Sequence, residues 1–166
     1  IPPTAKSVTT DADGKFTIAG LVPARYAVAA TRTLFFRPRK GAGPDTINVS
    51  PDQRLRDVQI LLMPTAVIAG RIVDENREPL RSVRVEALRG EYRDGIRTWV
   101  AGAQNTSDDR GEYRLFNLQP GTYYVRATLP NATSPLYYPG VPDSQDASPI
   151  QIEAGGELGA IDVQMR

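Results

Sequence analysis

The sequence predicts an all-β protein built from two tandem sandwich modules, the first of which lacks its N-terminal strands. Residues 107–125 repeat the pattern of residues 10–28 at a spacing of 97 residues, so that Tyr26 corresponds to Tyr123. Apolar and polar side chains alternate along both copies, which is typical of half-buried strands. The 14 glycines and 14 prolines suit a turn-rich chain. No segment has the period of a helix, and a repeat of this kind defines the architecture.

The second copy is the more complete, and its first three strands can be predicted in order. Residues 66–74 alternate at a period of two and predict a strand that ends in a polar turn. Residues 83–88 predict the next strand, and the polar segment 91–95 is expected to break it. Residues 97–106 predict a third strand with a bulge at Gly102, because a glycine inside a strand often marks one.

The rest of the second copy follows as a series of turns and strands. Residues 107–111 predict a hairpin turn, since Asp side chains accept backbone N–H groups and glycine accepts a positive φ. A second turn is expected at 118–121, where proline precedes glycine. A long loop over 130–149 is followed by closing strands at 150–152 and 161–165. The side chains expected to point inward are Tyr113, Leu115, Tyr123, Val125 and Ala127.

The first copy joins this pattern midway. Strands are expected at residues 16–18 and 26–30, in step with their counterparts in the second copy. Residues 47–49 match 150–152, and residues 57–59 match 162–164. The short segment 63–65 is a linker. These matches predict a partial sandwich over 1–64, which is the rear portion of the repeat, and a complete one over 65–166.

The first copy has no counterpart to residues 67–74 or 83–88. A sandwich without two strands exposes its core and leaves open backbone edges. Three arrangements would resolve this: an N-terminal portion missing from this chain, one core shared by both copies, or strands donated by a neighbouring molecule. Head-to-tail donation that does not close builds a filament. The expected partners are therefore proteins, with copies of this chain bound through open β-edges.

The pattern of turns and strands resembles the carboxypeptidase regulatory-like family of transthyretin-like, immunoglobulin-like β-sandwiches. The resemblance covers residues 66–166 and, in part, residues 5–64. It implies a non-catalytic module that occurs beside enzymes, in surface adhesins and in outer-membrane proteins. The residues that carry it are 70–74 (GRIVD), 79–80 (PL), 83–85 (VRV), 108–111 (DDRG) and 118–125 (LQPGTYYV).

Composition argues against several function classes. The net charge is only +1, which gives no reason to expect nucleic-acid binding. The chain contains no histidine and no cysteine, so the commonest general base and the commonest metal ligands are missing. No apolar stretch approaches the roughly 20 residues of a membrane span. We therefore expect no catalytic residues, no metal site, no cofactor and no membrane span.

One acidic motif has two interpretations. Residues 11–14 (DADG) could begin a calcium loop, but the downstream oxygen ligands and the closing glutamate are missing. At the matching place in the second copy, Arg110 replaces the second acidic residue. A hairpin turn is the better interpretation of both segments.

Aromatic residues supply the candidate contact surface. Phe35 and Phe36 are adjacent, as are Tyr137 and Tyr138, and adjacent side chains on an extended segment point to opposite sides. One of each pair could fill the core while the other, like Trp99, meets a sugar or a protein. The alternative is that the loops fold back and bury these rings.

Three triplets match the N-glycosylation pattern, at Asn48, Asn105 and Asn131, each at a strand end or in a loop. Together these features predict a non-catalytic structural module, extracellular or at the cell surface, that could assemble with copies of itself. The alternative function is a carbohydrate- or peptide-binding accessory module of a larger secreted or outer-membrane protein, with a glycan as its partner.

Overall fold

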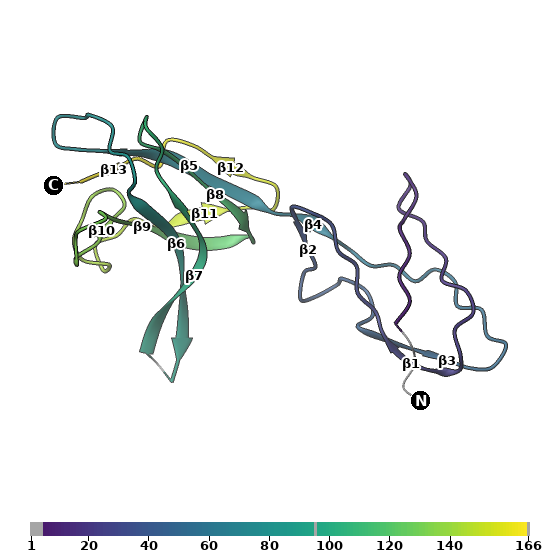
Figure 1. Ribbon diagram of the computed structural model, residues 1–166. Coiled ribbons are helices and arrows are strands. Elements are labelled where there is room, and N and C mark those ends of the chain that lie inside the picture. Colours follow the sequence, from purple (N-terminus) through teal and green to yellow (C-terminus); the bar gives the residue numbers. More distant parts are fainter. Residues whose placement is uncertain (1–4, 95, 166) are drawn as a thin grey trace. The chain divides into compact units, whose positions relative to one another are not determined.

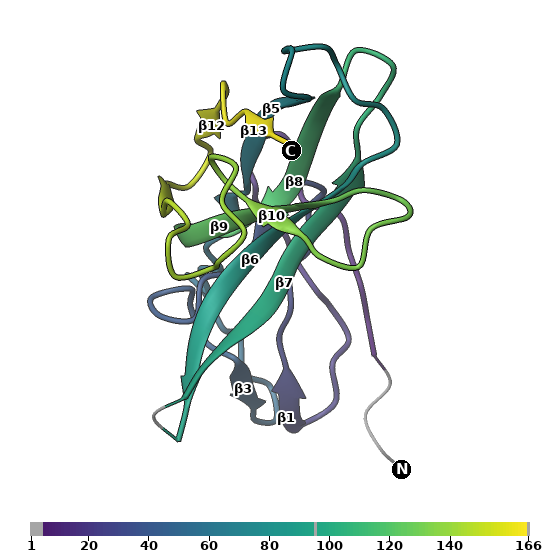
Figure 2. The ribbon, with the colours of Figure 1, turned by 90° about the vertical axis from the view of Figure 1, so that its left-hand side faces the viewer.

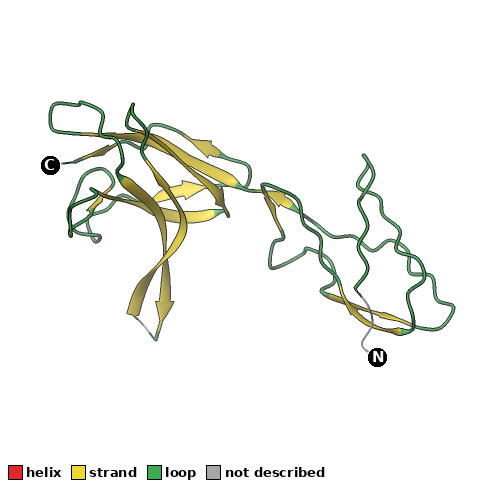
Figure 3. Cartoon of the chain, in the orientation of Figure 1, coloured by secondary structure: helices red, strands yellow, loops and turns green. Residues whose placement is uncertain are grey.

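The structure is a computed structural model that describes residues 5–94 and 96–165. Every regular element in these residues is a β-strand, so the all-β prediction is confirmed (Figure 3). The strands, labelled in Figure 1, are β1 Ala24–Ala27, β2 Phe35–Phe36, β3 Thr46–Val49, β4 Met63–Pro64, β5 Ala66–Val73, β6 Arg84–Arg93, β7 Ile96–Thr106, β8 Glu112–Leu118, β9 Gly121–Thr128, β10 Leu136–Tyr137, β11 Ile150–Ile152, β12 Glu157–Leu158 and β13 Val163–Gln164.

The chain forms two compact units. The first comprises Ile1–Arg32 and Arg37–Leu62, and the second comprises Thr33–Phe36 and Met63–Arg166. Strand β2 therefore belongs with the second unit, where it pairs with β4. The predicted division into 1–64 and 65–166, and the interpretation of the two parts as tandem copies of one sandwich, remain predictions.

The second unit contains two sheets that enclose one apolar core. One sheet has the order β10-β9-β6-β7, with β11 also paired to β9; in the other, β5 pairs with β8, β12 and β13. Strands β12 and β13 run parallel to successive parts of β5. Both sheets contribute side chains to the core. Its fully buried members are Ala66, Ile68, Ile72, Val83, Val85, Ala87, Leu115, Val125, Ala127 and Val163.

The hairpin of β6 and β7 corrects one prediction. Residues 91–93 were expected to break the strand, yet β6 continues to Arg93 and pairs with β7 throughout, as Figure 2 shows. Glu91 lies opposite Thr98, and the Thr98 hydroxyl donates a hydrogen bond of 3.2 Å to the Glu91 carbonyl oxygen. Backbone pairing holds this end of the hairpin, so a polar sequence does not end it. Gly95, part of the expected break, lies outside the described residues.

The predicted bulge is confirmed. Ala87 lies opposite Ala103 while Leu88 lies opposite Ala101, so Gly102 is the extra residue of β7. A Cβ atom at Gly102 would lie 2.9 Å from Cε1 of Tyr123. The bulge therefore brings the backbone of β7 close to the Tyr123 ring, which would have to shift to admit a larger residue.

The predicted hairpin turn between β7 and β8 is also confirmed. The Asp108 Oδ1 atom accepts hydrogen bonds from the backbone N–H groups of Arg110, at 2.9 Å, and Glu112, at 2.8 Å. Gly111 has a φ of 71°, a conformation that an L side chain rarely adopts. The turn is thus held by one carboxylate and one glycine, as its composition indicated.

The first unit has a single two-stranded ladder in its described residues, between β1 and β3. The strand predicted at residues 16–18 is not found, and residues 57–59, which match 162–164, form no strand either; all of these residues are described. Their counterparts in the second unit lie in β8 and β13, and β5 is the strand with which both of these pair. In the described residues of the first unit, no strand pairs with either of these segments.

Both units nevertheless use the same local devices. In each, a tyrosine hydroxyl donates to the carbonyl oxygen four residues earlier: Tyr26 to Val22 at 2.9 Å, and Tyr123 to Gln119 at 3.0 Å. In each, the aspartate that opens the turn accepts two backbone N–H groups. Asp11 does so at 3.0 and 2.8 Å, as Asp108 does in the second unit. Residues 11–14 therefore form a turn, but no strand flanks it in the described residues.

Candidate functional site

The loop over 130–149 lies on the outer face of the sheet formed by β9, β6 and β7 (Figure 2). Its short strand β10 pairs with β9, with Tyr137 opposite Arg126. Further backbone bonds fix the loop: Tyr138 donates to the Val125 carbonyl oxygen, and Ser148 donates to that of Tyr138, both at 2.9 Å. This part of the chain is therefore tied to the sheet at several points.

The loop encloses a small aromatic cluster. Tyr137 is only 9% exposed and packs with Leu88 and Ala147. Trp99 and Tyr124 of the sheet pack against this cluster. Their two rings meet each other edge to face, with centroids 4.8 Å apart and planes at 71°. The structure thus brings together two of the predicted contact residues, Trp99 and Tyr137, and uses both for packing.

Tyr138 points the other way from Tyr137, as expected for adjacent residues on an extended segment. It is half-buried and packs against the main core of the second unit. The peptide bond between Tyr138 and Pro139 is cis. The two tyrosines therefore pack into different clusters and do not form one flat aromatic platform.

Beside the aromatic cluster lies a buried charge. Glu86 is 3% exposed, and its Oε2 atom accepts hydrogen bonds from Nε and Nη2 of Arg126, at 3.0 and 2.7 Å. Its Oε1 atom accepts one from Nη2 of Arg84 at 3.0 Å. Burial alone would lower the pKa of the Arg126 guanidinium. The hydrogen bonds to Glu86 and Tyr137, together with the charges of these two residues, have the larger effect, so the pKa of Arg126 is raised. The sequence analysis did not predict this cluster, because Glu86 and Arg126 lie 40 residues apart in the sequence.

Phe35 and Phe36 form β2, in which Phe35 lies opposite Pro64 and Phe36 opposite Met63. Both phenylalanines are half-buried. Leu34, with a φ of 61°, is 54% exposed beside them. These residues lie far along the sequence from the aromatic cluster and form a separate apolar surface of the second unit.

The asparagines of the three glycosylation triplets are exposed, whereas Ser107, which ends the triplet at Asn105, is buried. Asn48 is on β3 and Asn131 is in the loop after β9. The amide of Asn105 is engaged: its Nδ2 atom donates to the Arg114 carbonyl oxygen at 2.8 Å, and its Oδ1 atom accepts from the N–H of Thr106 at 2.7 Å. Glycosylation at these sites remains a prediction.

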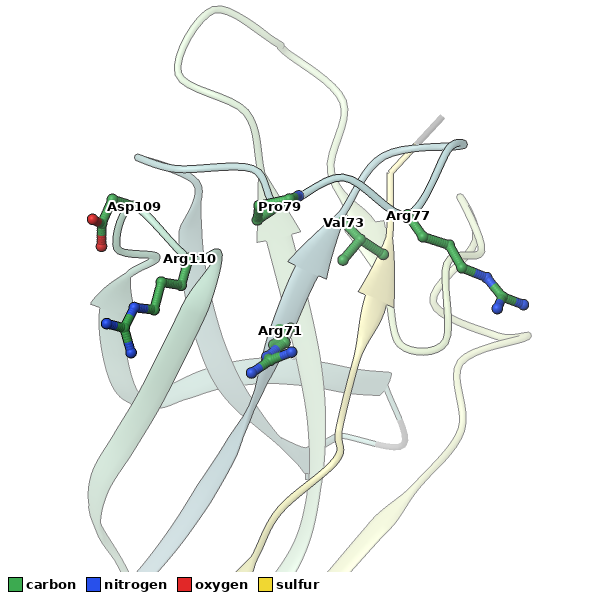
Figure 4. Close-up of a pocket in the computed structure, with 6 residues that line it drawn as sticks. All are labelled: Arg71, Val73, Arg77, Pro79, Asp109 and Arg110. Carbon is green, nitrogen blue, oxygen red and sulfur yellow. The ribbon is translucent and has the colours of Figure 1, made fainter.

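An arginine-lined hollow of about 330 Å³ was not foreseen (Figure 4). Arg71, Arg77 and Arg110 line it together with Asp109. Arg71 is already paired with Glu112, at 2.7 Å, and Figure 4 shows Arg77 extending away from the other two arginines. The guanidinium groups thus do not converge on one point, as an anion site would require.

The edge of the larger sheet is open at β7. Within the described residues, β7 has one pairing partner, β6, so it forms an edge of this sheet. Residues 98–103 (TWVAGA) carry no charge, and Val100 is 39% exposed. The described residues contain no cluster of three or more potential metal ligands. They also contain no helix that is long and apolar enough to cross a membrane.

Comparison with solved structures gives 12 matching chains, among them three of low identity. A Bacillus anthracis TIE protein is 18% identical with a TM-score of 0.37, over 60% of this chain and 16% of that protein. The dioxygenase domain of a dioxygenase carbohydrate-binding protein fusion from Streptomyces sp. SirexAA-E is 16% identical with a TM-score of 0.34, and the match covers 61% of this chain and 80% of that chain. A streptococcal ancillary pilin is 15% identical with a TM-score of 0.41, and the match covers 87% of this chain and 46% of that chain.

At these TM-scores the likenesses do not establish a common fold, and the chain spans a minor part of the Bacillus protein and less than half of the pilin. Comparison with curated proteins gave no match. The model of the carboxypeptidase regulatory-like domain matches residues 67–166, which is the greater part of the chain and most of the second unit. The chain therefore belongs to the carboxypeptidase regulatory-like domain family.

Proposed function

We propose that this chain is a non-catalytic structural module of an extracellular or cell-surface protein, and that copies of it associate through open sheet edges. Membership of the carboxypeptidase regulatory-like family supports a role as a module, although a fold alone does not define a function. The aromatic cluster and the buried Glu86 also support it, since their polar and aromatic groups are engaged with one another.

The observation that carries this proposal is the open edge of β7, an 11-residue strand. Proteins that must not pair at an edge protect it with charged residues, prolines, bulges or short strands. Residues 98–103 contain neither a charge nor a proline. The bulge at Gly102 leaves the preceding residues regular in their pairing with β6. A second β7 can therefore add to this edge by backbone hydrogen bonding.

The alternative, a carbohydrate- or peptide-binding accessory module, has less support. Sugar recognition by stacking needs an aromatic face open to solvent. Tyr137 is 9% exposed, and Trp99 meets Tyr124 edge-on at 4.8 Å. We therefore favour association between protein edges over glycan binding.

The test compares two variants that add the same charge at different places. Val100→Lys puts a charge on the open edge, and Asn76→Lys puts one on the exposed turn after β5. Light scattering coupled to size-exclusion chromatography, over a range of protein concentrations, should show association in the parent chain and in Asn76→Lys. It should show a monomer for Val100→Lys.

A parent chain that is monomeric at every concentration would contradict the proposal. Equal association of both variants would contradict it too, because the edge would then be irrelevant. Circular dichroism of each variant shows whether the fold is kept. Since Val100 is 39% exposed, the lysine side chain can reach water without disturbing the core.

A further inference from the structure

Strand β7 differs from the edge strands on the far side of its own sheet. There β9 pairs with the short strands β10 and β11, which have two and three residues. The backbone N–H and carbonyl groups of Tyr137 in β10 are also engaged, since they bond to those of Val141 at 2.7 and 2.8 Å. This edge therefore offers a second molecule no long strand to pair with.

The edges of the other sheet are protected as well. In β8, the Arg114 carbonyl oxygen accepts a hydrogen bond from Nδ2 of Asn105 at 2.8 Å. The same strand carries the charged side chains of Glu112 and Arg114. On the other side of this sheet, β12 and β13 have two residues each. Charges and short strands are devices that keep an edge from pairing with another molecule.

Strand β7 is long and has an uncharged stretch. It contains 11 residues, and residues 98–103 carry no charge. Its C-terminal end is closed, because the N–H of Thr106 donates to Oδ1 of Asn105 at 2.7 Å. The bulge at Gly102 interrupts the regular register with β6. The segment that can add a strand therefore runs from Thr98 to the bulge at Gly102.

A partner edge of the same kind is the β7 of a second copy. Because both copies would use the same strand, such a contact is isologous and closes once two chains have joined. We propose that two copies pair antiparallel through residues 98–102 about a two-fold axis at Val100, and that this contact ends at a dimer. The inference rests on the association through β7 proposed above and adds its symmetry and its limit. A filament is not built through this edge.

The pleat of the strand restricts where the axis can lie. Directly opposite residues of an antiparallel pair lie on the same face of the sheet, whereas neighbours along a strand lie on opposite faces. A two-fold axis therefore passes through a residue and places it opposite itself. Val100 is the central residue of the segment and is 39% exposed, whereas Trp99 is half-buried and meets Tyr124 edge to face. An axis at Val100 covers this apolar side chain with its own copy.

Disulfide crosslinking of the full chain tests the register. The chain contains no cysteine, so each introduced thiol is unique. A disulfide needs Cα atoms about 4.4–6.8 Å apart, and directly opposite residues of an antiparallel pair meet this requirement. Val100→Cys should therefore give a crosslinked dimer under mild oxidation.

Two control variants accompany it. Thr98→Cys lies on the same face of β7, but its two copies would be four residues apart along the strands, which is about 13 Å and too far for a disulfide. Asn76→Cys, on the exposed turn after β5, measures crosslinking by random collision.

Non-reducing gels give the readout. We expect about tenfold or more crosslinked dimer from Val100→Cys than from either control, because only its two thiols are within reach of each other. Equal crosslinking of Val100→Cys and Thr98→Cys would overturn the register. Crosslinking that appears only when these two variants are mixed would overturn it too, since the axis would then lie at Trp99.

Light scattering of the parent chain tests the limit of the assembly. We expect a mass that levels off at two chains as protein concentration rises. Larger species that Val100→Lys abolishes would overturn the closed dimer and leave association through β7 intact. A parent chain that stays monomeric would contradict the association itself, and this inference with it. Failure of the proposed function and failure of this inference alone are therefore distinguishable.

Discussion

Tyr26 lies opposite Ile47 in the ladder of β1 and β3, and their counterparts Tyr123 and Ile150 lie opposite each other in the ladder of β9 and β11. The neighbouring pairs keep the same register in both ladders. A slip by one residue would turn every side chain to the opposite face of the sheet. The sequence repeat is therefore reproduced in the register of this one ladder.

The tyrosine hydroxyls give the first prediction. Tyr123→Phe removes the hydrogen bond that the hydroxyl donates to the Gln119 carbonyl oxygen, at 3.0 Å, and the one that it accepts from Nη2 of Arg89, at 3.1 Å. Because Tyr123 is 3% exposed, we expect a loss of about 1–2 kcal/mol in the free energy of unfolding. Urea denaturation measures it.

The matched variant is Tyr26→Phe, which removes the equivalent bond to Val22. Tyr26 is half-buried, so water can replace the lost partner and the change should stay below about 0.5 kcal/mol. A larger loss for Tyr26→Phe than for Tyr123→Phe would show that the first unit is as well covered as the second.

Gly70 gives the second prediction. A Cβ atom there would lie 2.0 Å from the Ile161 carbonyl oxygen, a backbone atom that cannot move without displacing the strand segments beside β5. Gly70→Ala should therefore destabilise the protein by about 1–3 kcal/mol. Gly159→Ala is the control, because no atom lies within 4 Å of its added Cβ. Thermal unfolding that is equally affected by both variants would contradict this account.

The third prediction concerns alkaline pH. Burial, and then the charges of Asp162 and Tyr138, raise the pKa of Tyr113 above its ordinary value of 10.0. The folded state thus keeps a proton that the unfolded state loses above pH 10. The contribution of Tyr113 to the free energy of unfolding is fully present below pH 10. Above pH 10 it falls by about 1.4 kcal/mol per pH unit.

Tyr113→Phe should remove this dependence. It also removes the hydrogen bond of 2.5 Å from the tyrosine hydroxyl to the Ile161 carbonyl oxygen, which costs about 1 kcal/mol at neutral pH. Urea unfolding measured from pH 8 to pH 11 should therefore give a flatter profile for the variant. Parallel profiles for the parent and Tyr113→Phe would refute the assignment to Tyr113.

The fourth prediction concerns the loop over the sheet. Tyr137→Ala removes a buried ring from the cluster that contains Trp99 and Tyr124. We expect a loss of stability of about 2–4 kcal/mol. Because Trp99 is the single tryptophan of the chain, its fluorescence should also shift to longer wavelength. Thr133→Ala, at an exposed loop position, is the control. A Tyr137→Ala protein of unchanged stability and emission would show that Tyr137 is available for contacts.

Much of the second unit could be predicted, because each feature rests on local chemistry. The turn at residues 108–111 depends on one aspartate and one glycine, and the bulge depends on Gly102. The alternation of residues 66–73 and 123–127 defines their inward faces. These determinants lie within a few residues of the features that they produce.

The parts that could not be predicted depend on contacts between distant segments. The sequence at 91–93 is polar, and its strand exists because β7 pairs with it. The sequence at 15–21 alternates correctly, but no strand of the described residues pairs with it, and it forms no strand. Likewise, the burial of Tyr137 depends on where the loop folds, and the cluster at Glu86 depends on Arg126 of a neighbouring strand.

The central claim is that the first unit is the rear portion of the sandwich that the second unit forms in full. Heteronuclear NMR of the full chain tests it most directly, through cross-strand contacts. We predict contacts between Tyr26 and Ile47 and between Tyr123 and Ile150, with no strand contacts at residues 15–21. A different register between β1 and β3, or a strand at 15–21 paired within the same monomer, would contradict the claim.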